Sequence, residues 1–376
     1  MAASKTICLS SNTSWYLYNF RASTVRRLRA DGFRVVCIAP EDGYSKKLVA
    51  DLGCEWLPLR MSNQGSNPLR DAAVIYQFYR YYRRLRPAAA LHFTIKNNVY
   101  GTWAARLLGI PAINNVSGLG TAFIRGGLVS AIVRLLYKTS QPFAHRVFCQ
   151  NEEDFAQLVD SKLVRRHSIE LLPGSGVDLE RFNPALHTPH TGPFRFLYAG
   201  RMLADKGLFE LIAAVNAINA GGIQCALWLS GFADVDNVST ISHQQLTRWA
   251  QQPGIAWLGP TDTIEDVYSA VDCVVLPSYR EGMPRSLLEA GAMGLPVVTT
   301  NVPGCRNIVT DGYNGLLCEA KSSSSLQLAM LDMLQMTDNE RRAMGANGRA
   351  LVAQQYDEHK VVEATLNAVQ SALRAH

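Results

Sequence analysis

Short apolar segments alternate with longer amphipathic segments along almost the whole chain, and this alternation constrains the fold more than any other feature. In the first half, the apolar segments TICLSS (6–11), RVVCIAP (34–40) and AAALHFTI (88–95) are separated by stretches with helical periodicity. Strands that alternate with helices form βαβ units, whose strands lie parallel in one sheet. The sequence therefore predicts an α/β protein built on parallel sheets.

One segment, from 173 to 193, interrupts this alternation with a high content of proline, glycine and histidine. The alternation then resumes with FRFLYAG, QCALWLSG and DCVVLPS. A chain of 376 residues is long enough for about two domains. We predict two doubly wound, Rossmann-like domains, residues 1–180 and residues 181–376, facing a cleft in which the ligands bind. The C-terminal helix could pack back on the first domain.

The charge of the chain is unevenly distributed between these halves. Residues 1–180 hold 23 Lys and Arg against 13 Asp and Glu, although the net charge of the whole chain is only +6. An excess of basic residues indicates that the first half meets an anionic partner. Nucleic acid is a poor candidate for this partner, because the basic residues lie on domains to which the motifs below assign another function.

The search for targeting signals and the spacing of the cysteines indicate where in the cell the protein is expected. The first 21 residues lack the apolar region and cleavage site of a signal peptide. No apolar stretch reaches the ~18 residues of a membrane span. The eight cysteines form no CxxC pair, which indicates reduced thiols and argues against a zinc site. We therefore expect a cytoplasmic protein, or one that touches a membrane from its cytoplasmic side.

Two glutamates frame the start of a predicted helix in the segment EGMPRSLLEA. Glu281 precedes the helix, Pro284 suits its first turn, and Glu289 lies about one and a half turns inside it. Gly282 allows a ligand to approach the backbone, and the free N–H groups of the first turn attract an anion. A carboxylate can accept hydrogen bonds from both hydroxyls of a vicinal diol. The pattern indicates a nucleotide-sugar site, although two solvated acids would fit the spacing equally well.

Three ordered motifs resemble those of the family 4 retaining glycosyltransferases. PSYREGMPRSLLEAGAMGLPVVTTNVPGCRNIVTDGYNGLL resembles the donor-site signature, in which the E-x7-E pair falls on Glu281 and Glu289. AGRMLADKG resembles the element whose arginine and lysine hold the diphosphate, here Arg201 and Lys206. PGSGVDLERFNP resembles the hinge motif, and the resemblance covers essentially the whole chain. By themselves Arg201 and Lys206 would equally fit surface charges, although a guanidinium and an ammonium suit a departing diphosphate.

The resemblance implies a GT-B fold, a UDP-sugar donor on the second domain, an acceptor on the first, and neither cofactor nor catalytic metal. It also implies transfer with retention, in which the departing diphosphate takes the acceptor's proton on the same face of the sugar. Glu281 and the amides of Gly282 and Met283 would contact the sugar, while Glu289 would contact the ribose. The residues expected near the base, at the end of a strand, are Trp257, Leu258 and Gly259.

Some motifs imitate other classes of site. DVD at 234–236 imitates a metal-binding DxD, but loops like it occur in this family without a metal. GLGTAF and GSGVDL each lack the third glycine of a dinucleotide fingerprint, so NAD binding is not favoured.

Three stretches in the first half resemble members of the family that build lipid-linked oligosaccharides, namely SSNTSWYLYNFR, HFTIKNNVYG and NNVSGLGTAF. The nearest resemblance is to bacterial hexosaminyltransferases acting on undecaprenyl-diphosphate-linked sugars. Arg21 and Lys96 are candidate partners of the lipid diphosphate. The full set of candidate acceptor-binding residues is Tyr18, Arg21, Lys96, Asn98, Gly118 and Gly120. The same residues could instead serve as helix caps and turn residues. Many family members place a histidine beside the reacting sugar, but His92 does not align clearly with it.

The segment YQFYRYYRRLRP (76–87) interleaves five aromatic residues with four arginines on a predicted helix. This mixture suits the surface of an anionic membrane, and it suits a partly buried helix with extended arginines equally well. GGLVSAIVRLLYK (126–138) is a second candidate contact.

The resemblance, together with these patterns, implies a retaining, metal-independent transferase that moves a hexose or N-acetylhexosamine from a UDP-sugar to a polyprenyl-diphosphate-linked saccharide. Its setting would be the assembly of bacterial surface glycan: O-antigen, capsule or glycoprotein glycan. Two alternatives remain open: a transferase with a soluble acceptor, and a non-catalytic nucleotide-sugar-binding protein.

Overall fold

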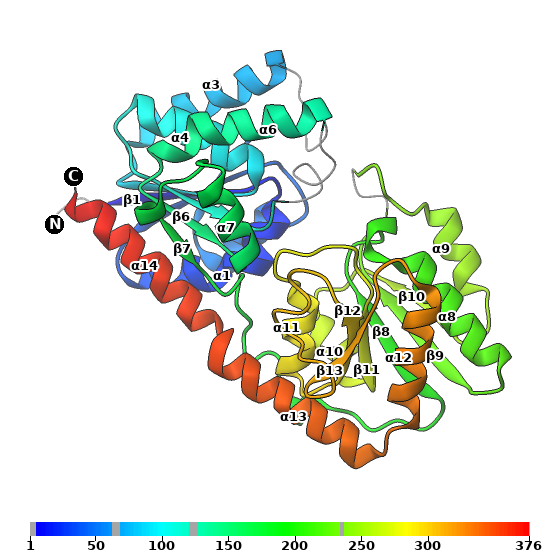
Figure 1. Ribbon diagram of the computed structural model, residues 1–376. Coiled ribbons are helices and arrows are strands. Elements are labelled where there is room, and N and C mark those ends of the chain that lie inside the picture. The colour runs from blue at the N-terminus through cyan, green and yellow to red at the C-terminus, as the bar shows by residue number, and fades with distance from the viewer. Residues whose placement is uncertain (1–4, 62–67, 120–126, 234–236, 376) are drawn as a thin grey trace. The chain divides into compact units, whose positions relative to one another are not determined.

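The chain folds into two units, each built around one parallel β-sheet (Figure 1). The structure is a computed structural model that describes residues 5–61, 68–119, 127–233 and 237–375. The first unit comprises Met1–Ser175 and His359–His376, and the second comprises Gly176–Glu358. The second unit thus begins before residue 181, and the last residues of the chain belong to the first unit.

The first unit contains a seven-stranded parallel sheet in the order β3-β2-β1-β4-β5-β6-β7. Its strands are β1 (Thr6–Ser10), β2 (Arg34–Ala39), β3 (Glu55–Pro58), β4 (Ala89–Phe93), β5 (Ala112–Val116), β6 (Arg146–Cys149) and β7 (Ile169–Leu171). Its helices are α1 (Ser14–Ala30), α2 (Ser45–Leu52), α3 (Pro68–Leu85), α4 (Ile95–Leu107), α6 (Gly127–Ser140), η1 (Gln141–Phe143), α7 (Glu152–Asp160), η2 (Arg166–Ser168) and α14 (Glu358–Arg374). The strand order reverses between β1 and β4, so the carboxyl ends of these strands form the switch point at which doubly wound sheets bind ligands.

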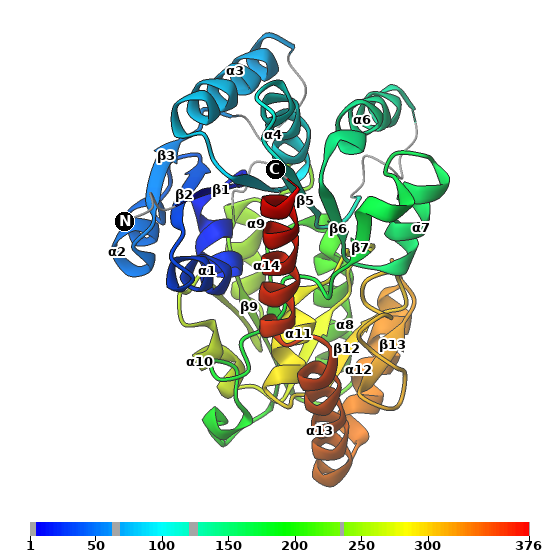
Figure 2. The same cartoon turned by 90° about the vertical axis from the view of Figure 1, so that its left-hand side faces the viewer.

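Helices cover both faces of this sheet, because side chains of successive strand residues point to opposite faces. Ile7 and Leu9 of β1 share a core cluster with α1, α2 and α14, whereas Cys8 lies in a cluster with α3, α4, α6 and α7. Figure 2 shows α1 and α14 on the side of the sheet that faces the viewer. The C-terminal helix buries Val361 and Leu366 in the first of these clusters, so it is an integral part of the first unit's core.

The second unit contains a six-stranded parallel sheet in the order β10-β9-β8-β11-β12-β13. Its strands are β8 (Phe194–Ala199), β9 (Cys225–Ser230), β10 (Ile255–Gly259), β11 (Cys273–Leu276), β12 (Val297–Thr300) and β13 (Gly315–Cys318). Its helices are η3 (Pro184–Leu186), η4 (Ala204–Lys206), α8 (Leu208–Ala220), α9 (His243–Ala250), α10 (Ile264–Ser269), α11 (Arg285–Ala292), α12 (Ser323–Gln335) and α13 (Asp338–Gln355). Here the order reverses between β8 and β11, which places a second switch point at their carboxyl ends.

All eight cysteines lie buried as free thiols. Most of them sit on strands that are buried on both faces, where a small apolar side chain fits. Burial raises the pKa of the Cys318 thiol to about 12, so the reactive thiolate is scarce at neutral pH.

Residues near the two ends of the second unit are hydrogen-bonded to each other. The N–H of Val177 donates to the carbonyl oxygen of Tyr356 over 2.9 Å, and the N–H of Glu358 donates to the carbonyl oxygen of Val177 over 3.1 Å. These bonds form an isolated parallel bridge between Val177 and Asp357. The chain therefore enters and leaves the second unit at neighbouring points.

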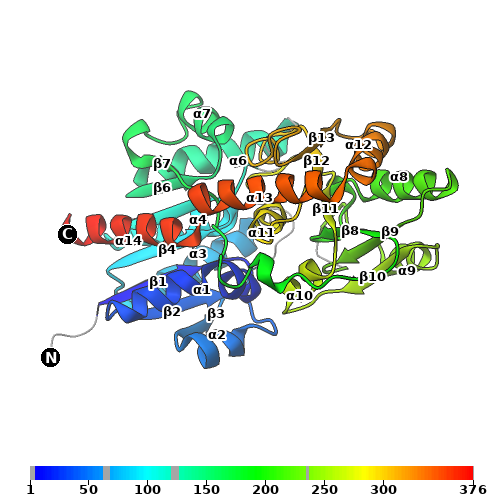
Figure 3. The same cartoon turned by 90° about the horizontal axis from the view of Figure 1, so that it is seen from below.

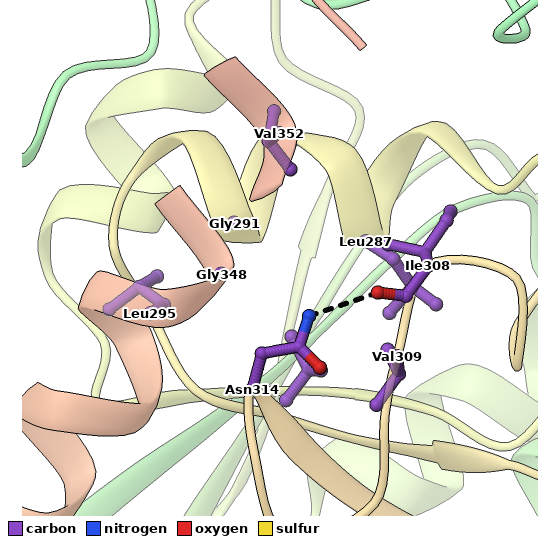
Figure 4. Close-up of a pocket in the computed structure, with 9 residues that line it drawn as sticks. Leu287, Gly291, Leu295, Ile308, Val309, Asn314, Gly348 and Val352 are labelled. Atoms are coloured by element: carbon purple, nitrogen blue, oxygen red, sulfur yellow. Dashed lines mark hydrogen bonds between the residues drawn. The ribbon is translucent and has the colours of Figure 1, made fainter. Parts of the chain in front are cut away.

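Helices α11 and α13 lie side by side in the second unit, with glycines at their contact (Figure 3). A Cβ atom on Gly345 would lie 1.9 Å from the carbonyl oxygen of Gly294, so only glycine fits there. One turn further along α13, a small apolar cavity opens beside Gly348 and Asn314 (Figure 4). A Cβ atom on Gly348 would meet its nearest atom, the Cα of Gly291, at an ordinary 3.6 Å.

This difference predicts opposite effects for two glycine-to-alanine substitutions on the same helix. Gly348→Ala should raise the free energy of unfolding by about 1 kcal/mol, because alanine is the better helix former and the cavity accepts its methyl group. Gly345→Ala should lower the free energy of unfolding by about 1–3 kcal/mol through overpacking. Urea unfolding of the two variants measures both shifts, and equal effects would contradict the packing of α11 against α13.

Candidate active site

The loops that follow β8 and β11 lie against each other at the carboxyl edge of the second sheet. Gly207 has a φ of 72°, and a Cβ atom there would lie 2.1 Å from the carbonyl oxygen of Pro277. The N–H of Tyr279 donates to the carbonyl oxygen of Asp205 over 3.0 Å. These backbone contacts require glycine at 207, and they hold the loop after β8 against the loop after β11.

This arrangement joins Lys206 and Glu281, which lie 75 positions apart in the sequence, in an ion pair. The hydroxyl of Ser278 donates to the same carboxylate oxygen over 2.7 Å. Only 17% of the Lys206 side chain and 13% of the Glu281 side chain are exposed, so water screens the pair weakly. The structure thus brings together two predicted site residues that come from different motifs.

Glycines also lie at the carboxyl ends of β8, β9 and β10, namely Gly200, Gly231 and Gly259. Gly231 follows β9 with a φ of 146°, and a Cβ atom there would lie 1.8 Å from the carbonyl oxygen of Gly200. Its N–H donates to the carbonyl oxygen of Gly259 over 2.9 Å. Arg201 follows Gly200 and is exposed; its guanidinium forms no hydrogen bond or ion pair with the described residues. The ends of β8, β9 and β10 therefore approach one another closely beside an exposed cation.

Helix α11 begins at Arg285, so Pro284 is the N-cap residue rather than part of the first turn. Its φ of −72° and ψ of 111° belong to the extended region. The side chain of Pro284 does not cap this end of the helix, and the N–H of Leu287 donates to the carbonyl oxygen of Pro284 over 3.2 Å. The N-terminus of a helix favours an anion. Gly282 and Met283 lie in the loop between Glu281 and this N-terminus, and both are half-buried.

Glu289 is held from two directions. The Nε of Arg285 donates to its Oε1 over 2.8 Å, and the hydroxyl of Tyr268 donates to its Oε2 over 3.0 Å. Burial raises the pKa of the Glu289 carboxyl, and Arg285 opposes that shift. A carboxylate offers about four acceptor directions, so two remain after these bonds. Two acceptors are the number that a vicinal diol needs.

The residues expected near the base occupy the end of β10. The Trp257 ring meets the His243 ring edge to face, with 4.7 Å between centroids. Leu258 is 45% exposed, and the carbonyl oxygen of Gly259 accepts from the hydroxyl of Ser230 over 3.1 Å. This strand end shares the sheet edge with Gly231, whose N–H donates to the carbonyl oxygen of Gly259.

The candidate acceptor residues of the first unit do not form one group. Tyr18 donates to Asp51 of α2 over 2.7 Å, whereas Lys96 pairs with Asp71 of α3 over 3.2 Å. Because α2 and α3 pack on opposite faces of the sheet, these two side chains are anchored to different layers. Gly118 follows β5 with a φ of 123°, and Gly120 lies outside the described residues.

Two further candidates are engaged inside the first unit. Arg21 is only 2% exposed; its guanidinium lies 4.4 Å from the centroid of Phe93 and donates to the hydroxyl of Tyr16 over 3.2 Å. Asn98 is fully buried, and its amide donates to the carbonyl oxygen of Asn115 over 2.8 Å. Both lie near the carboxyl ends of β4 and β5, but a ligand would have to displace these internal contacts to reach them.

His92 of β4 is also fully buried. Its Nδ1 lies 2.8 Å from Oδ1 of Asn114, and its Nε2 lies 2.8 Å from the hydroxyl of Tyr82. An amide oxygen only accepts, so Nδ1 carries the proton and the unprotonated Nε2 accepts from Tyr82. Both ring nitrogens are therefore occupied within the core.

This environment predicts a pH-dependent stability. Burial lowers the pKa of His92 to about 4, partly offset by Asn114, whereas an unfolded histidine titrates near about 6.5. The contribution of His92 is therefore complete above about pH 6.5 and is lost as the pH falls toward 4, up to about 3 kcal/mol. Urea unfolding at pH 7 and pH 4.5 should show a steeper loss for the wild type than for His92→Gln. Equal losses in both proteins would contradict a neutral His92.

The aromatic and basic residues of α3 divide between the core and the surface. Phe78 and Tyr82 are fully buried, Tyr79 and Tyr81 are partly buried against the same core cluster, and Tyr76 is 61% exposed. The four arginines of the segment, Arg80, Arg83, Arg84 and Arg86, are exposed. Most of the aromatic surface therefore serves the core, while the charged surface faces outward. Among the described residues, no helix combines the length and hydropathy of a membrane span.

Three site residues were absent from the sequence prediction. Arg285 lies four positions before Glu289, and this i,i+4 spacing could have identified it as a helical ion pair. Ser278 lies three positions before Glu281, at the end of the predicted strand DCVVLPS. Nothing in the local sequence indicates that Tyr268, from α10, reaches Glu289.

Comparison with known proteins places these features in a family. Residues 20–174 match the family described as glycosyl transferase 4-like domain, and residues 181–351 match glycosyl transferases group 1. The chain is 27% identical to a Campylobacter jejuni protein over 92% of this chain and 93% of the relative. That relative is N,N'-diacetylbacillosaminyl-diphospho-undecaprenol alpha-1,3-N-acetylgalactosaminyltransferase. An Escherichia coli relative, UDP-Gal:alpha-D-GlcNAc-diphosphoundecaprenol alpha-1,3-galactosyltransferase, is 26% identical over 70% of each chain.

Solved structures share the fold at lower identity. Sucrose-phosphate synthase from Thermosynechococcus elongatus superposes with a TM-score of 0.80 at 19% identity, covering 99% of this chain and 100% of that chain. Anabaena Alr3699/HepE, solved in complex with UDP-glucose, superposes with a TM-score of 0.78 at 18% identity, covering 97% and 99%. The predicted GT-B fold is confirmed.

Proposed function

We propose that this chain, which belongs to the family 4 glycosyltransferases with the GT-B fold, moves a hexose or N-acetylhexosamine from a UDP-sugar to a polyprenyl-diphosphate-linked saccharide. The transfer proceeds with retention and without a metal, and it serves the assembly of bacterial surface glycan. The observation that carries the proposal is the ion pair of Lys206 and Glu281 at the carboxyl edge of the second sheet. The relatives from Campylobacter jejuni and Escherichia coli, which carry diphospho-undecaprenol acceptors in their names, support the acceptor class.

The residues at this edge have the chemistry that the donor requires. Arg201 and Lys206 offer positive charge to the diphosphate, and the first turn of α11 offers backbone N–H groups. As the bond between the sugar's anomeric carbon and the diphosphate oxygen breaks, these groups stabilise the negative charge that collects on the diphosphate. The acceptor hydroxyl attacks the anomeric carbon on the same face and passes its proton to the departing diphosphate. Glu281 accepts hydrogen bonds from the sugar hydroxyls and orients the sugar for this exchange.

A reaction screen tests the proposal. The full chain is incubated with a panel of UDP-sugars and a synthetic polyprenyl-diphosphate sugar, and the products are read by mass spectrometry. We expect one UDP-sugar to extend the lipid-linked acceptor by one sugar with release of UDP, also in the presence of EDTA. Extension of a soluble saccharide alone would favour the soluble-acceptor alternative. Binding of UDP without any release from a UDP-sugar would indicate a non-catalytic nucleotide-sugar-binding protein.

Access to a lipid acceptor requires contact with a membrane, and we assign this contact to the exposed arginines of α3 and to Arg86, which follows the helix. We expect the protein to sediment with vesicles that contain anionic phospholipid, and neutralising Arg80, Arg83, Arg84 and Arg86 to glutamine should release it. Each basic residue near such a surface contributes about 1 kcal/mol. Vesicles of neutral lipid are the control. Undiminished sedimentation of the quadruple variant would exclude α3 as the contact.

A further inference from the structure

Arg285 makes a contact with Glu289 that the proposed chemistry does not use. Both residues lie on α11, one helical turn apart, and their side chains are 15% and 12% exposed. The 2.8 Å bond from Nε of Arg285 ends on Oε1 of Glu289, while Tyr268 of α10 holds Oε2. The carboxylate is thus fixed at both oxygens before any ligand arrives.

The groups that surround Glu289 show why its contact with Arg285 matters. Two cations and one phenol face the carboxyl: Arg285 from α11, Arg181 from the segment preceding η3, and Tyr268 from α10. Arg181 is committed elsewhere, because it donates to Glu265 over 2.7 Å and to the carbonyl oxygen of Asp262 over 2.9 Å. Among the described residues, Arg285 is the cation that bonds to Glu289.

A largely buried carboxylate without a bonded cation becomes protonated more easily. Burial disfavours the charged form of a carboxyl group, and a nearby cation favours it. A protonated carboxyl also converts one acceptor oxygen into a donor, so it fits the two hydroxyls of a diol less well. The orientation and the charge of Glu289 therefore both depend on the residue at position 285.

We propose that Arg285 is a positioning residue for the donor, which keeps Glu289 charged and oriented so that the carboxylate accepts the two ribose hydroxyls of the nucleotide. The inference rests on the proposed function, because it takes Glu289 as the residue that binds the ribose. Arg285 itself contacts neither hydroxyl in this arrangement. Its effect on binding is transmitted through Glu289.

A nucleotide that lacks both ribose hydroxyls distinguishes a positioning role of Arg285 from direct contact of Arg285 with the nucleotide. We would measure the Kd of UDP and of 2′,3′-dideoxy-UDP by calorimetry for the wild type, Arg285→Met, Arg285→Lys and Glu289→Gln. Arg285→Met should weaken UDP binding by about tenfold and leave dideoxy-UDP binding within about twofold, because it removes the charged hydrogen bond that holds Glu289 in place for the diol. Arg285→Lys should recover part of the affinity for UDP. Glu289→Gln should show the same selective loss, and adding Arg285→Met to it should change little.

The pH profile gives a second readout that a merely structural defect would not change. Burial raises the pKa of Glu289, and removing Arg285 should raise it further. UDP affinity of Arg285→Met should therefore begin to fall at a higher pH than that of the wild type as the solution is acidified, whereas Glu289→Gln should be insensitive to this titration. Thermal melting of each variant verifies that it is folded.

The outcomes distinguish this inference from the function on which it rests. Equal losses for UDP and dideoxy-UDP in Arg285→Met would overturn it, since they would mean that Arg285 contacts the diphosphate. Unchanged UDP affinity and an unchanged pH profile would overturn it as well. Failure of the wild type to bind UDP at all would count against the proposed function instead. Arg285→Lys retains the charge and allows the comparison even if Arg285→Met does not fold.

Discussion

We expect Lys206→Met to lower kcat for sugar transfer by about two to three orders of magnitude. The substitution removes the ammonium group that stabilises charge on the departing diphosphate, an interaction that strengthens as the bond breaks. It also leaves the Glu281 carboxylate without its cation at a site where only 13% of that side chain is exposed. Because the lost interaction is greatest in the transition state, kcat should fall more than KM rises.

Initial rates of UDP release with saturating acceptor measure this effect. Lys46→Met is the matched control, because Lys46 is an exposed lysine of α2 and the chemical change is the same. The control should stay within about twofold of the wild type, as exposed substitutions usually change little. A kcat of Lys206→Met within a few-fold of the wild type would show that the Lys206–Glu281 pair is structural only.

Gly231→Ala should be among the most damaging substitutions to the second unit. Its φ of 146° is strained for any other residue, and the added Cβ would lie 1.8 Å from the carbonyl oxygen of Gly200. The backbone must move, and that movement breaks the approach of the β8, β9 and β10 ends. We expect the free energy of unfolding to fall by about 3 kcal/mol or more, with a loss of UDP binding in the fraction that stays folded.

Urea unfolding and calorimetry with UDP check both parts of this expectation. Gly348→Ala is the comparison within the same unit, since the same chemical change there should be stabilising. If Gly231→Ala unfolds at the wild-type urea concentration, the close approach of the strand ends is wrong.

The sequence was sufficient to predict the parallel sheets, because parallel strands buried on both faces must be apolar runs and the segments between them must be helices. The resemblance to family motifs also predicted that Lys206 and Glu281 serve one donor site, and the structure joins the two residues in an ion pair. The boundary of the second unit was harder to predict from the sequence. The segment 173–193 marks a break in composition, but the exact residue at which contacts change depends on the hydrogen bonds of Val177 with Tyr356 and Glu358.

The candidate acceptor residues show what local sequence could not supply. Arg21 and Asn98 follow strands at the switch point, as a binding residue would, and yet both are buried. Their partners, Phe93 and Tyr16 for Arg21 and Asn115 for Asn98, are set by how helices α1 and α4 pack on the sheet. Tyr268 was missed for the same reason, because its contact with Glu289 depends on where α10 packs.

The bridge between Val177 and Asp357 has a consequence for how such proteins could diversify. The polypeptide from Gly176 to Glu358 is one uninterrupted stretch with adjoining ends, whereas the remainder needs α14 to complete its core. A recombination event, or an engineer, could therefore exchange the whole stretch as a cassette and leave the host's own core intact. The two units could in this way be inherited separately.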